Sequence, residues 1–194
     1  MKLCTDSVDS GKFIVACGNS GAGKSTLVRG ALFEFKESLN YLRTSTTRTR
    51  RPNEDEVEYE FVDIESYKRL AKESKTWDDT IIYGNHYGVD YGNYNSQLDA
   101  GLNYIVCTVP DLEIVESLKS TYGIYRTSTL LINVSHEVTK QRLKNERITG
   151  EMSRLAIEES FETPNSFDLI FTPTGDLDST QQSFNKIIGD ILHG

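Results

Sequence analysis

Hydrophobic positions along the chain gather in short, largely unbroken runs that are separated by longer amphipathic stretches. Strands buried on both faces produce such runs, and four are present, at residues 13–17, 104–109, 130–134 and 169–171. Apolar residues at helical spacing predict helices over residues 25–35, 64–73, 111–120 and 183–192, with a weak helix over 95–100. Strands that alternate with helices predict an α/β fold, a parallel sheet with helices on both faces.

The pattern turns polar between the first two of these strands, from Thr44 to Ala100. Within this stretch we predict a strand over residues 59–62, a short β run at 81–83 and a glycine-rich turn at 84–88. Further along, Ser135 follows the third apolar strand and suits the N-cap of the next helix. The polar stretch is therefore expected to be an excursion from the main sheet.

Composition narrows the class of protein. The chain has 194 residues, 37% of them hydrophobic and 26% charged, which fits one compact soluble domain. No apolar run approaches the ~20 residues that span a bilayer, and the first residues lack the apolar centre of a signal peptide. A formal net charge of −8 argues against general nucleic-acid binding. We expect a cytoplasmic protein without membrane or nucleic-acid partners, as a monomer or weak homodimer.

The cysteines do not suggest a disulfide or a zinc site. There are three, Cys4, Cys17 and Cys107, with no C-x-x-C pair. Cys17 and Cys107 fall within apolar strand runs, so we expect them to be reduced and to lie in the core.

A phosphate-binding loop follows the first strand. Gly18 to Ser25 match G-x-x-x-x-G-K-[ST] without a mismatch, and a helical pattern comes directly after. The glycines let backbone N–H groups point at phosphate oxygens, Lys24 reaches the β- and γ-phosphates, and the Ser25 hydroxyl can bind Mg²⁺. The strand before the loop and the helix after it argue against a chance glycine turn. We predict an ATP–Mg²⁺ site formed by Gly18, Asn19, Ser20, Gly21, Ala22, Gly23, Lys24, Ser25 and Thr26.

A second cluster of positive charge lies in the polar stretch. Arg48, Arg50 and Arg51 stand within four residues, and their forked guanidinium groups suit bidentate contacts to a phosphate. An acidic run follows, made of Glu54, Asp55, Glu56 and Glu58. A solvated loop with mutually cancelling charges is therefore an equal alternative on spacing alone.

These motifs together resemble the guanylate kinase family. Residues 45–52, followed by Glu56, Tyr59 and 61–62, resemble its GMP-binding segment, and residues 83–88 resemble its G-N-x-Y-G turn. With the phosphate loop and a later Arg-Leu…Arg-Leu region they stand in the family's order, and the likeness spans most of residues 12–192. The resemblance implies a P-loop NTPase-type sheet with a small mixed α/β insertion and a helical lid.

The resemblance also implies roles for particular residues. The α-phosphate of GMP would be held by Arg48, Arg51, Tyr59 and Tyr87. Asp78 would accept from guanine N1–H and N2–H₂, and Thr44 would contact the base. Lid arginines would stabilise charge on the transferring group, namely Arg142, Arg147 and Arg154. A single domain is then expected over 1–194, with a core over 12–43, 101–141 and 156–192, an acceptor-binding insertion over 44–100 and a lid over 142–155.

Three positions depart from the family's pattern. Cys107-Thr108-Val109 replace an Asp-x-Asp, so a carboxylate linked to Mg²⁺ is missing, and Asp111 is at best a displaced substitute. Val89 replaces a serine that contacts the base, and Asp78 is one methylene shorter than the usual glutamate. These departures leave phosphoryl transfer expected and the choice of acceptor open.

Three alternative functions are compatible with this sequence. The first is phosphorylation of GMP or dGMP by ATP, with small-molecule nucleotides as the only partners. The second keeps the fold but uses another nucleotide or a ribose phosphate as acceptor, which the losses at Val89 and at Cys107 to Val109 favour. The third is a non-catalytic, protein-binding module. Such modules usually lose the phosphate loop, whereas Lys24 and Ser25 are intact here.

Overall fold

A parallel sheet forms the centre of the molecule. The computed structural model describes residues 10–50, 56–82, 84–145 and 166–194. In the main sheet the strand order is β2-β7-β1-β8-β9, and every described pairing is parallel. The strands are β1 (Phe13–Cys17), β2 (Leu39–Tyr41), β7 (Asn103–Thr108), β8 (Thr127–Ile132) and β9 (Leu169–Phe171). The four predicted strands are confirmed, and β2, a strand of three residues at the sheet edge, was missed.

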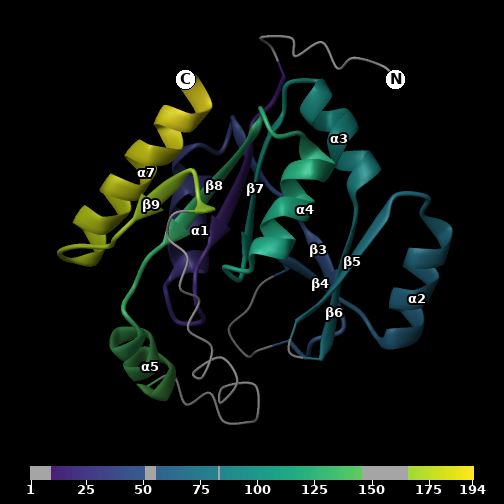
Figure 1. Cartoon of the computed structure of the whole chain (residues 1–194), viewed down its shortest axis with the longest axis horizontal. Coiled ribbons are helices and arrows are strands. Elements are labelled where there is room, and N and C mark those ends of the chain that lie inside the picture. The colour runs from purple at the N-terminus through teal and green to yellow at the C-terminus, as the bar shows by residue number, and fades with distance from the viewer. Residues whose placement is uncertain (1–9, 51–55, 83, 146–165) are drawn as a thin grey trace.

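Helices cover both faces of this sheet, as predicted. On one face lie α1 (Lys24–Glu34) and α7 (Leu177–His193), and on the other lie α3 (Tyr91–Asp99) and α4 (Leu112–Tyr122) (Figure 1). Side chains of a strand alternate between its faces. Ile14 and Ala16 of β1 therefore join the cluster under α1 and α7, while Phe13 and Val15 join the cluster under α3 and α4.

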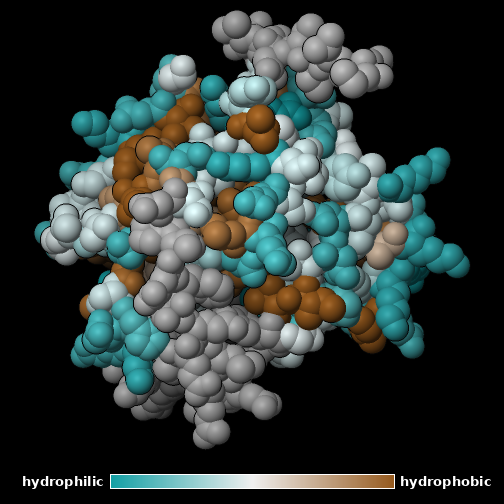
Figure 2. Space-filling model, in the orientation of Figure 1, coloured by the Kyte–Doolittle hydropathy of each residue, from teal (hydrophilic) through white to brown (hydrophobic). Residues whose placement is uncertain are grey.

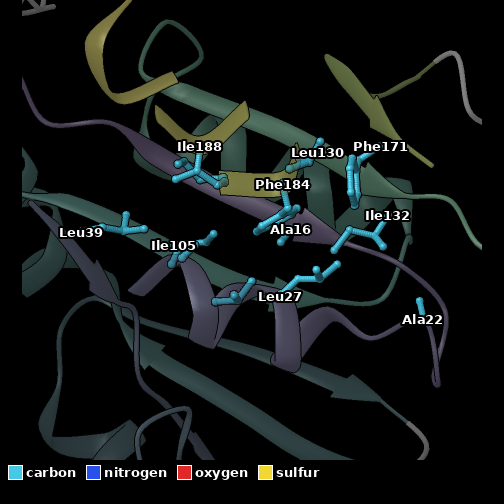
Figure 3. Packing of buried hydrophobic residues seen from close by; sticks show 13 residues of the cluster. Ala16, Ala22, Leu27, Leu39, Ile105, Leu130, Ile132, Phe171, Phe184 and Ile188 are labelled. Atoms are coloured by element: carbon cyan, nitrogen blue, oxygen red, sulfur yellow. The ribbon is translucent and has the colours of Figure 1, made fainter. Parts of the chain in front are cut away.

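The first of these clusters is built from both helices and all five strands of the main sheet. Leu27 of α1 and Phe184 and Ile188 of α7 pack over Ala16 and Leu130 of the sheet (Figure 3). The two helices approach closely at Gly30, where an added Cβ would collide with the side-chain amide of Gln181. That amide in turn donates to the Leu27 carbonyl at 2.9 Å.

A second, smaller sheet is formed by the polar stretch. Its order is β4-β3-β6-β5, with strands β3 (Thr44–Thr46), β4 (Tyr59–Phe61), β5 (Trp77–Ile82) and β6 (Asn85–Asp90). Helix α2 (Ile64–Glu73) lies on this sheet and packs Tyr67 edge-on to Trp77, with ring centroids 5.4 Å apart. Position 88 favours glycine, because a Cβ there would collide with the Tyr67 hydroxyl and the Trp77 ring.

Several predicted boundaries were wrong. The predicted turn over 84–88 is mostly strand β6, with only Gly84 in a left-handed conformation at φ 75°. Helix α3 begins at Tyr91 rather than at 95, and α7 begins at Leu177 rather than at 183 because Asp176 caps it, accepting from Ser179 N at 2.8 Å. Strand β8 covers 127–132 rather than 130–134.

The remaining helix starts where the sequence indicated. Helix α5 spans His136–Asn145, and the Ser135 hydroxyl accepts from the Val138 amide at 3.5 Å, which confirms Ser135 as its N-cap.

The surface is mixed in character. In Figure 2 hydrophilic side chains dominate the side occupied by α2, and hydrophobic residues form separate patches elsewhere on this face. Within the described ranges, no helix combines the length and the apolar character that crossing a membrane requires.

Candidate active site

The phosphate loop joins β1 to α1 at the carboxyl edge of the main sheet. Gly23, the N-cap of α1, has φ 90°, and Gly21 has φ 78°, conformations that side chains with a Cβ disfavour. The loop closes on itself through a hydrogen bond from the Ala22 amide to the Asn19 carbonyl at 3.1 Å. Because the N-terminus of α1 opens at Gly23, its free N–H groups and helix dipole favour an anion there.

Lys24 lies along this loop. Its Nζ donates to the carbonyls of Gly18 at 2.6 Å and Asn19 at 3.1 Å. The ammonium group is thus held at the mouth of the loop, the place where the sequence predicts the β- and γ-phosphates.

A cleft of about 580 Å³ extends from the phosphate loop to the second sheet. This volume lies in the range of small-molecule sites. Most of the described residues predicted to bind ligands line it: Ser20, Gly21, Ala22, Gly23, Lys24, Ser25, Thr26, Thr44, Arg48, Tyr59, Asp78, Tyr87 and Arg142. Gly18 and Asn19 belong to the same loop through the hydrogen bonds above. Arg51, Arg147 and Arg154 lie outside the described residues.

Arg48 and two tyrosines meet where the second sheet borders this cleft. Arg48 is only 8% exposed, and its guanidinium carbon lies 5.1 Å from the ring centre of Tyr59. The rings of Tyr59 and Tyr87 stand edge to face, 6.0 Å apart. Burial raises the pKa of Tyr59, so its phenol stays protonated and able to donate. A buried cation beside two hydroxyl donors suits a phosphate dianion.

The sequence left two interpretations of the arginine cluster open, a phosphate site and a solvated loop, and the structure assigns one to each of two arginines. Arg50 pairs with the exposed Glu56, its Nη1 lying 3.3 Å from Oε1, as in a solvated loop with compensating charges. Arg48 is buried and faces the cleft, so the solvated-loop reading is wrong for Arg48.

Strands β5 and β6 form a further part of the cleft wall. Asp78, Thr80 and Ile82 alternate along β5 and all line the cleft, while Val89 stands opposite Asp78 in the register. The side chain of Val89 packs against the core cluster under α3 and α4. Thr80 was missed by the sequence analysis. Thr80 could have been found from its position two residues after Asp78, because this spacing places both side chains on one face of a strand.

Glu58 is the second site residue that sequence reasoning missed. It is 4% exposed and lines the cleft, although its sequence grouped it with an acidic run for which a solvated loop was an equal alternative. The Ser25 hydroxyl donates to Glu58 Oε2 at 2.9 Å, and Arg29 Nη2 lies 3.1 Å from Oε1. Asp111, considered as a displaced carboxylate, instead caps α4 by accepting from the Glu113 amide at 2.9 Å.

Arg142 extends from α5 to the phosphate loop. Its Nη1 donates to the carbonyls of Gly21 at 3.2 Å and Ala22 at 3.4 Å. An arginine in this place contacts the loop that would hold a triphosphate, although it comes from a helix more than a hundred positions later in the chain.

Known proteins share both this sequence and this fold. A family model described as guanylate kinase matches residues 10–190. The chain belongs to the guanylate kinase family. It is 29% identical over 185 residues to the guanylate kinase of Rickettsia bellii (strain RML369-C), covering 93% of this chain and 94% of that protein. It is 26% identical over 183 residues to the guanylate kinase of Prochlorococcus marinus subsp. pastoris, covering 91% and 96%.

A solved guanylate kinase has the same fold. The crystal structure of the enzyme from Anaplasma phagocytophilum superposes with a TM-score of 0.67 at 20% sequence identity, covering 96% of this chain and 88% of that one. The predicted P-loop NTPase-type fold is thereby confirmed, as is the resemblance to guanylate kinases. The roles of individual residues stay predictions.

The site suits a metal that is bound mainly through a nucleotide. In the parts of the chain that the structure describes, no three His, Cys, Asp or Glu side chains group as a metal site. Mg²⁺ commonly takes only one or two protein ligands and completes its shell with phosphates and water. The Ser25 hydroxyl, with the buried Glu58 carboxylate beside it, fits such a partial site.

Proposed function

We propose that this protein transfers the γ-phosphoryl group of ATP to GMP or dGMP. The observation that carries the proposal is that one cleft joins the phosphate loop to the buried Arg48 and its two tyrosines. Two sets of phosphate-binding residues in one cleft are what a transfer between two nucleotides needs. Membership of the guanylate kinase family supports GMP, and it does not favour a ribose phosphate acceptor or a non-catalytic module.

The donor nucleotide is assigned to the loop end of the cleft. Residues 18–26 hold the triphosphate, with Lys24 at the β- and γ-phosphates and Ser25 as the protein ligand of Mg²⁺. Bound there, Mg²⁺ would supply positive charge that neutralises the phosphate oxygens. Pro173 and Leu177 add apolar surface at the cleft wall, which suits the flat face of a base.

The acceptor is assigned to the second sheet. Arg48, Tyr59 and Tyr87, together with Arg51, bind the α-phosphate of GMP. Asp78 accepts from the two guanine donors N1–H and N2–H₂, a pair that adenine does not present, and Thr44 contacts the same base. The acceptor's phosphate thereby points along the cleft toward the loop.

The transfer itself needs positioning and charge stabilisation more than proton transfer. An anionic oxygen of the GMP phosphate attacks the γ-phosphorus of ATP, the bond from that phosphorus to the β–γ bridging oxygen breaks, and ADP leaves with the electron pair. No general base is required, because the attacking oxygen carries no proton. Arg142, with Arg147 and Arg154, stabilises charge on the transferring group. The monomeric or weakly dimeric state and the cytoplasmic location stay predictions.

A coupled assay of ADP release tests the proposal. Wild-type protein is offered ATP with GMP, dGMP, AMP, CMP, UMP or ribose bisphosphate, and we expect GMP or dGMP to give the highest kcat/KM. Lys24→Ala should lower kcat by at least about 10²-fold, because a charge contact to the transition state is lost. Near-normal turnover by Lys24→Ala, or a preference for the sugar phosphate, contradicts the assignment.

A further inference from the structure

A buried carboxylate stands directly behind the proposed metal ligand. Glu58 and Asp78 are the two carboxylates that line the cleft among the described residues, and Glu58 is the one beside the phosphate loop. It comes from the chain leading into β4, 33 positions after Ser25. Its side chain is held from the other side by Arg29 of α1. Glu58 lies beside the proposed metal ligand, but it has been given no role of its own toward donor or acceptor.

We infer that Glu58 is a positioning residue for the divalent cation of the bound nucleotide. The inference rests on the proposed function only in placing a metal–nucleotide complex at the phosphate loop. A hydroxyl oxygen that ligates a cation must direct a lone pair at the metal and its proton elsewhere. Glu58 Oε2 accepts a hydrogen bond from the Ser25 hydroxyl, with 2.9 Å between the two oxygens. This hydrogen bond fixes the rotation of the hydroxyl and leaves the lone pairs of Ser25 Oγ for the cation.

The carboxylate also supplies negative charge where the chain lacks it. Cys107, Thr108 and Val109 line the cleft at the end of β7 and offer no carboxylate to a cation. Glu58 stands close to the same cleft wall and is nearly excluded from water, so its charge is weakly screened. Outer groups that hold a metal ligand in place typically change metal affinity 10- to 100-fold when removed.

A purely structural role for Glu58 predicts something different. In that reading Glu58 only joins the second sheet to α1 through its ion pair with Arg29, at 3.1 Å. Its loss would then weaken the fold, and nucleotide affinity would fall equally with and without metal. The positioning role and the purely structural role are therefore distinguished by how much metal strengthens nucleotide binding.

The test measures the dissociation constant of AMP-PNP, an ATP analogue that is not hydrolysed, by calorimetry in EDTA and in Mn²⁺. The ratio of the two constants is the metal effect. We expect Glu58→Gln to reduce this ratio about 10-fold or more, with affinity in EDTA changed less than about twofold. Ser25→Ala should reduce the ratio similarly, and the double variant should lose no more than either single variant, because both act through one contact.

Matched controls are available two positions further along the chain and in the same ion pair. Glu60 accepts from the Ser45 hydroxyl at the same distance, 2.9 Å, but it is exposed and does not line the cleft. Glu60→Gln should leave the ratio unchanged. Arg29→Met removes the ion pair and keeps the Ser25 hydrogen bond, so it should also keep the ratio. If Glu58→Gln does not fold, Glu58→Asp carries the test, because it keeps the charge but withdraws it from Ser25 and should therefore lower the ratio.

Two results overturn the inference: a metal ratio in Glu58→Gln that is unchanged, whether or not both affinities fall, or a reduced ratio in Arg29→Met. Additive losses in the double variant overturn it as well. Because the measurement contains no acceptor, a failure to phosphorylate GMP bears on the proposed function alone, and a failure of the metal ratio bears on Glu58.

Discussion

Guanine recognition is open to a direct test at Asp78 and Val89, which face each other across β5 and β6. Asp78→Asn keeps the shape of the side chain and replaces one acceptor oxygen by an NH₂ donor. One guanine donor then meets a donor, and the other loses a charged partner. We expect kcat/KM for GMP to fall, while the KM for ATP, which binds at the other end of the cleft, stays within about twofold.

The size of this loss follows from the place of Asp78 in the cleft. Hydrogen bonds to a charged group contribute about 1.5–3 kcal/mol each. Asp78 is partly exposed, so solvent weakens its two hydrogen bonds to guanine. We therefore take the low end of this range, about 3 kcal/mol for the two bonds together. That corresponds to roughly a 100-fold fall in kcat/KM.

Val89→Ser changes the same surface in the opposite direction. A serine hydroxyl adds one neutral hydrogen bond to the base, worth about 1 kcal/mol, so kcat/KM for GMP should rise about fivefold. The substitution also removes methyl groups that pack against the core under α3 and α4, so the free energy of unfolding should fall by about 1 kcal/mol. Activity and stability should therefore move in opposite directions.

The assay is initial-rate ADP release with GMP, IMP and AMP as acceptors. Asp79→Asn is the matched control, because Asp79 is the neighbouring carboxylate on the other face of β5, hydrogen-bonded by the Tyr67 hydroxyl and remote from the cleft lining. It should leave the preference for GMP unchanged. Equal GMP kinetics in wild type and Asp78→Asn, or the same loss in Asp79→Asn, would refute guanine recognition by Asp78.

Two further predictions concern the acceptor phosphate and the core. Arg48→Ala should raise the KM for the monophosphate at least about tenfold more than the KM for ATP in steady-state kinetics, since it removes the buried cation beside Tyr59; a larger effect on ATP contradicts the two-ended cleft. Burial raises the pKa of the Cys17 thiol from 9.0 to about 12, so at pH 8 its thiolate is about a thousandfold scarcer than in an unfolded chain. Mass spectrometry after iodoacetamide treatment should show slow labelling of Cys17 in native protein and fast labelling in urea, and equal rates would contradict its burial.

The sequence predicted the parts of this protein that are determined locally. The phosphate loop was readable because a strand, three glycines and a helix stand next to each other in the chain, and the structure has them in that order. The long core strands were readable because burial on both faces makes them apolar at nearly every position. Short strands such as β2 and β3, three residues each, carry too few positions for any period to show.

The rest depended on contacts between distant segments. Glu58 has the composition of a solvated acidic run, and only its approach to Ser25 and Arg29 buries it. The first turn of α7 reads as polar, yet Thr180 is buried and Gln181 packs on Gly30 of α1. Arg142 was predicted from family resemblance, since no local pattern joins it to a loop at Gly21.

The second sheet enters the fold between two strands that are neighbours. Chain leaves the main sheet after β2 and returns to it at β7, and β2 and β7 pair directly, with Leu39 beside Asn103. The hydrogen-bond ladder of the main sheet is therefore complete whatever the intervening segment contains. Evolution can lengthen, shorten or rewrite the surface that reads the acceptor without breaking a pair in the ladder that carries the phosphate loop. Substitutions at positions such as Val89 leave that ladder intact, and a new acceptor can be accommodated by exchange of a single contiguous segment.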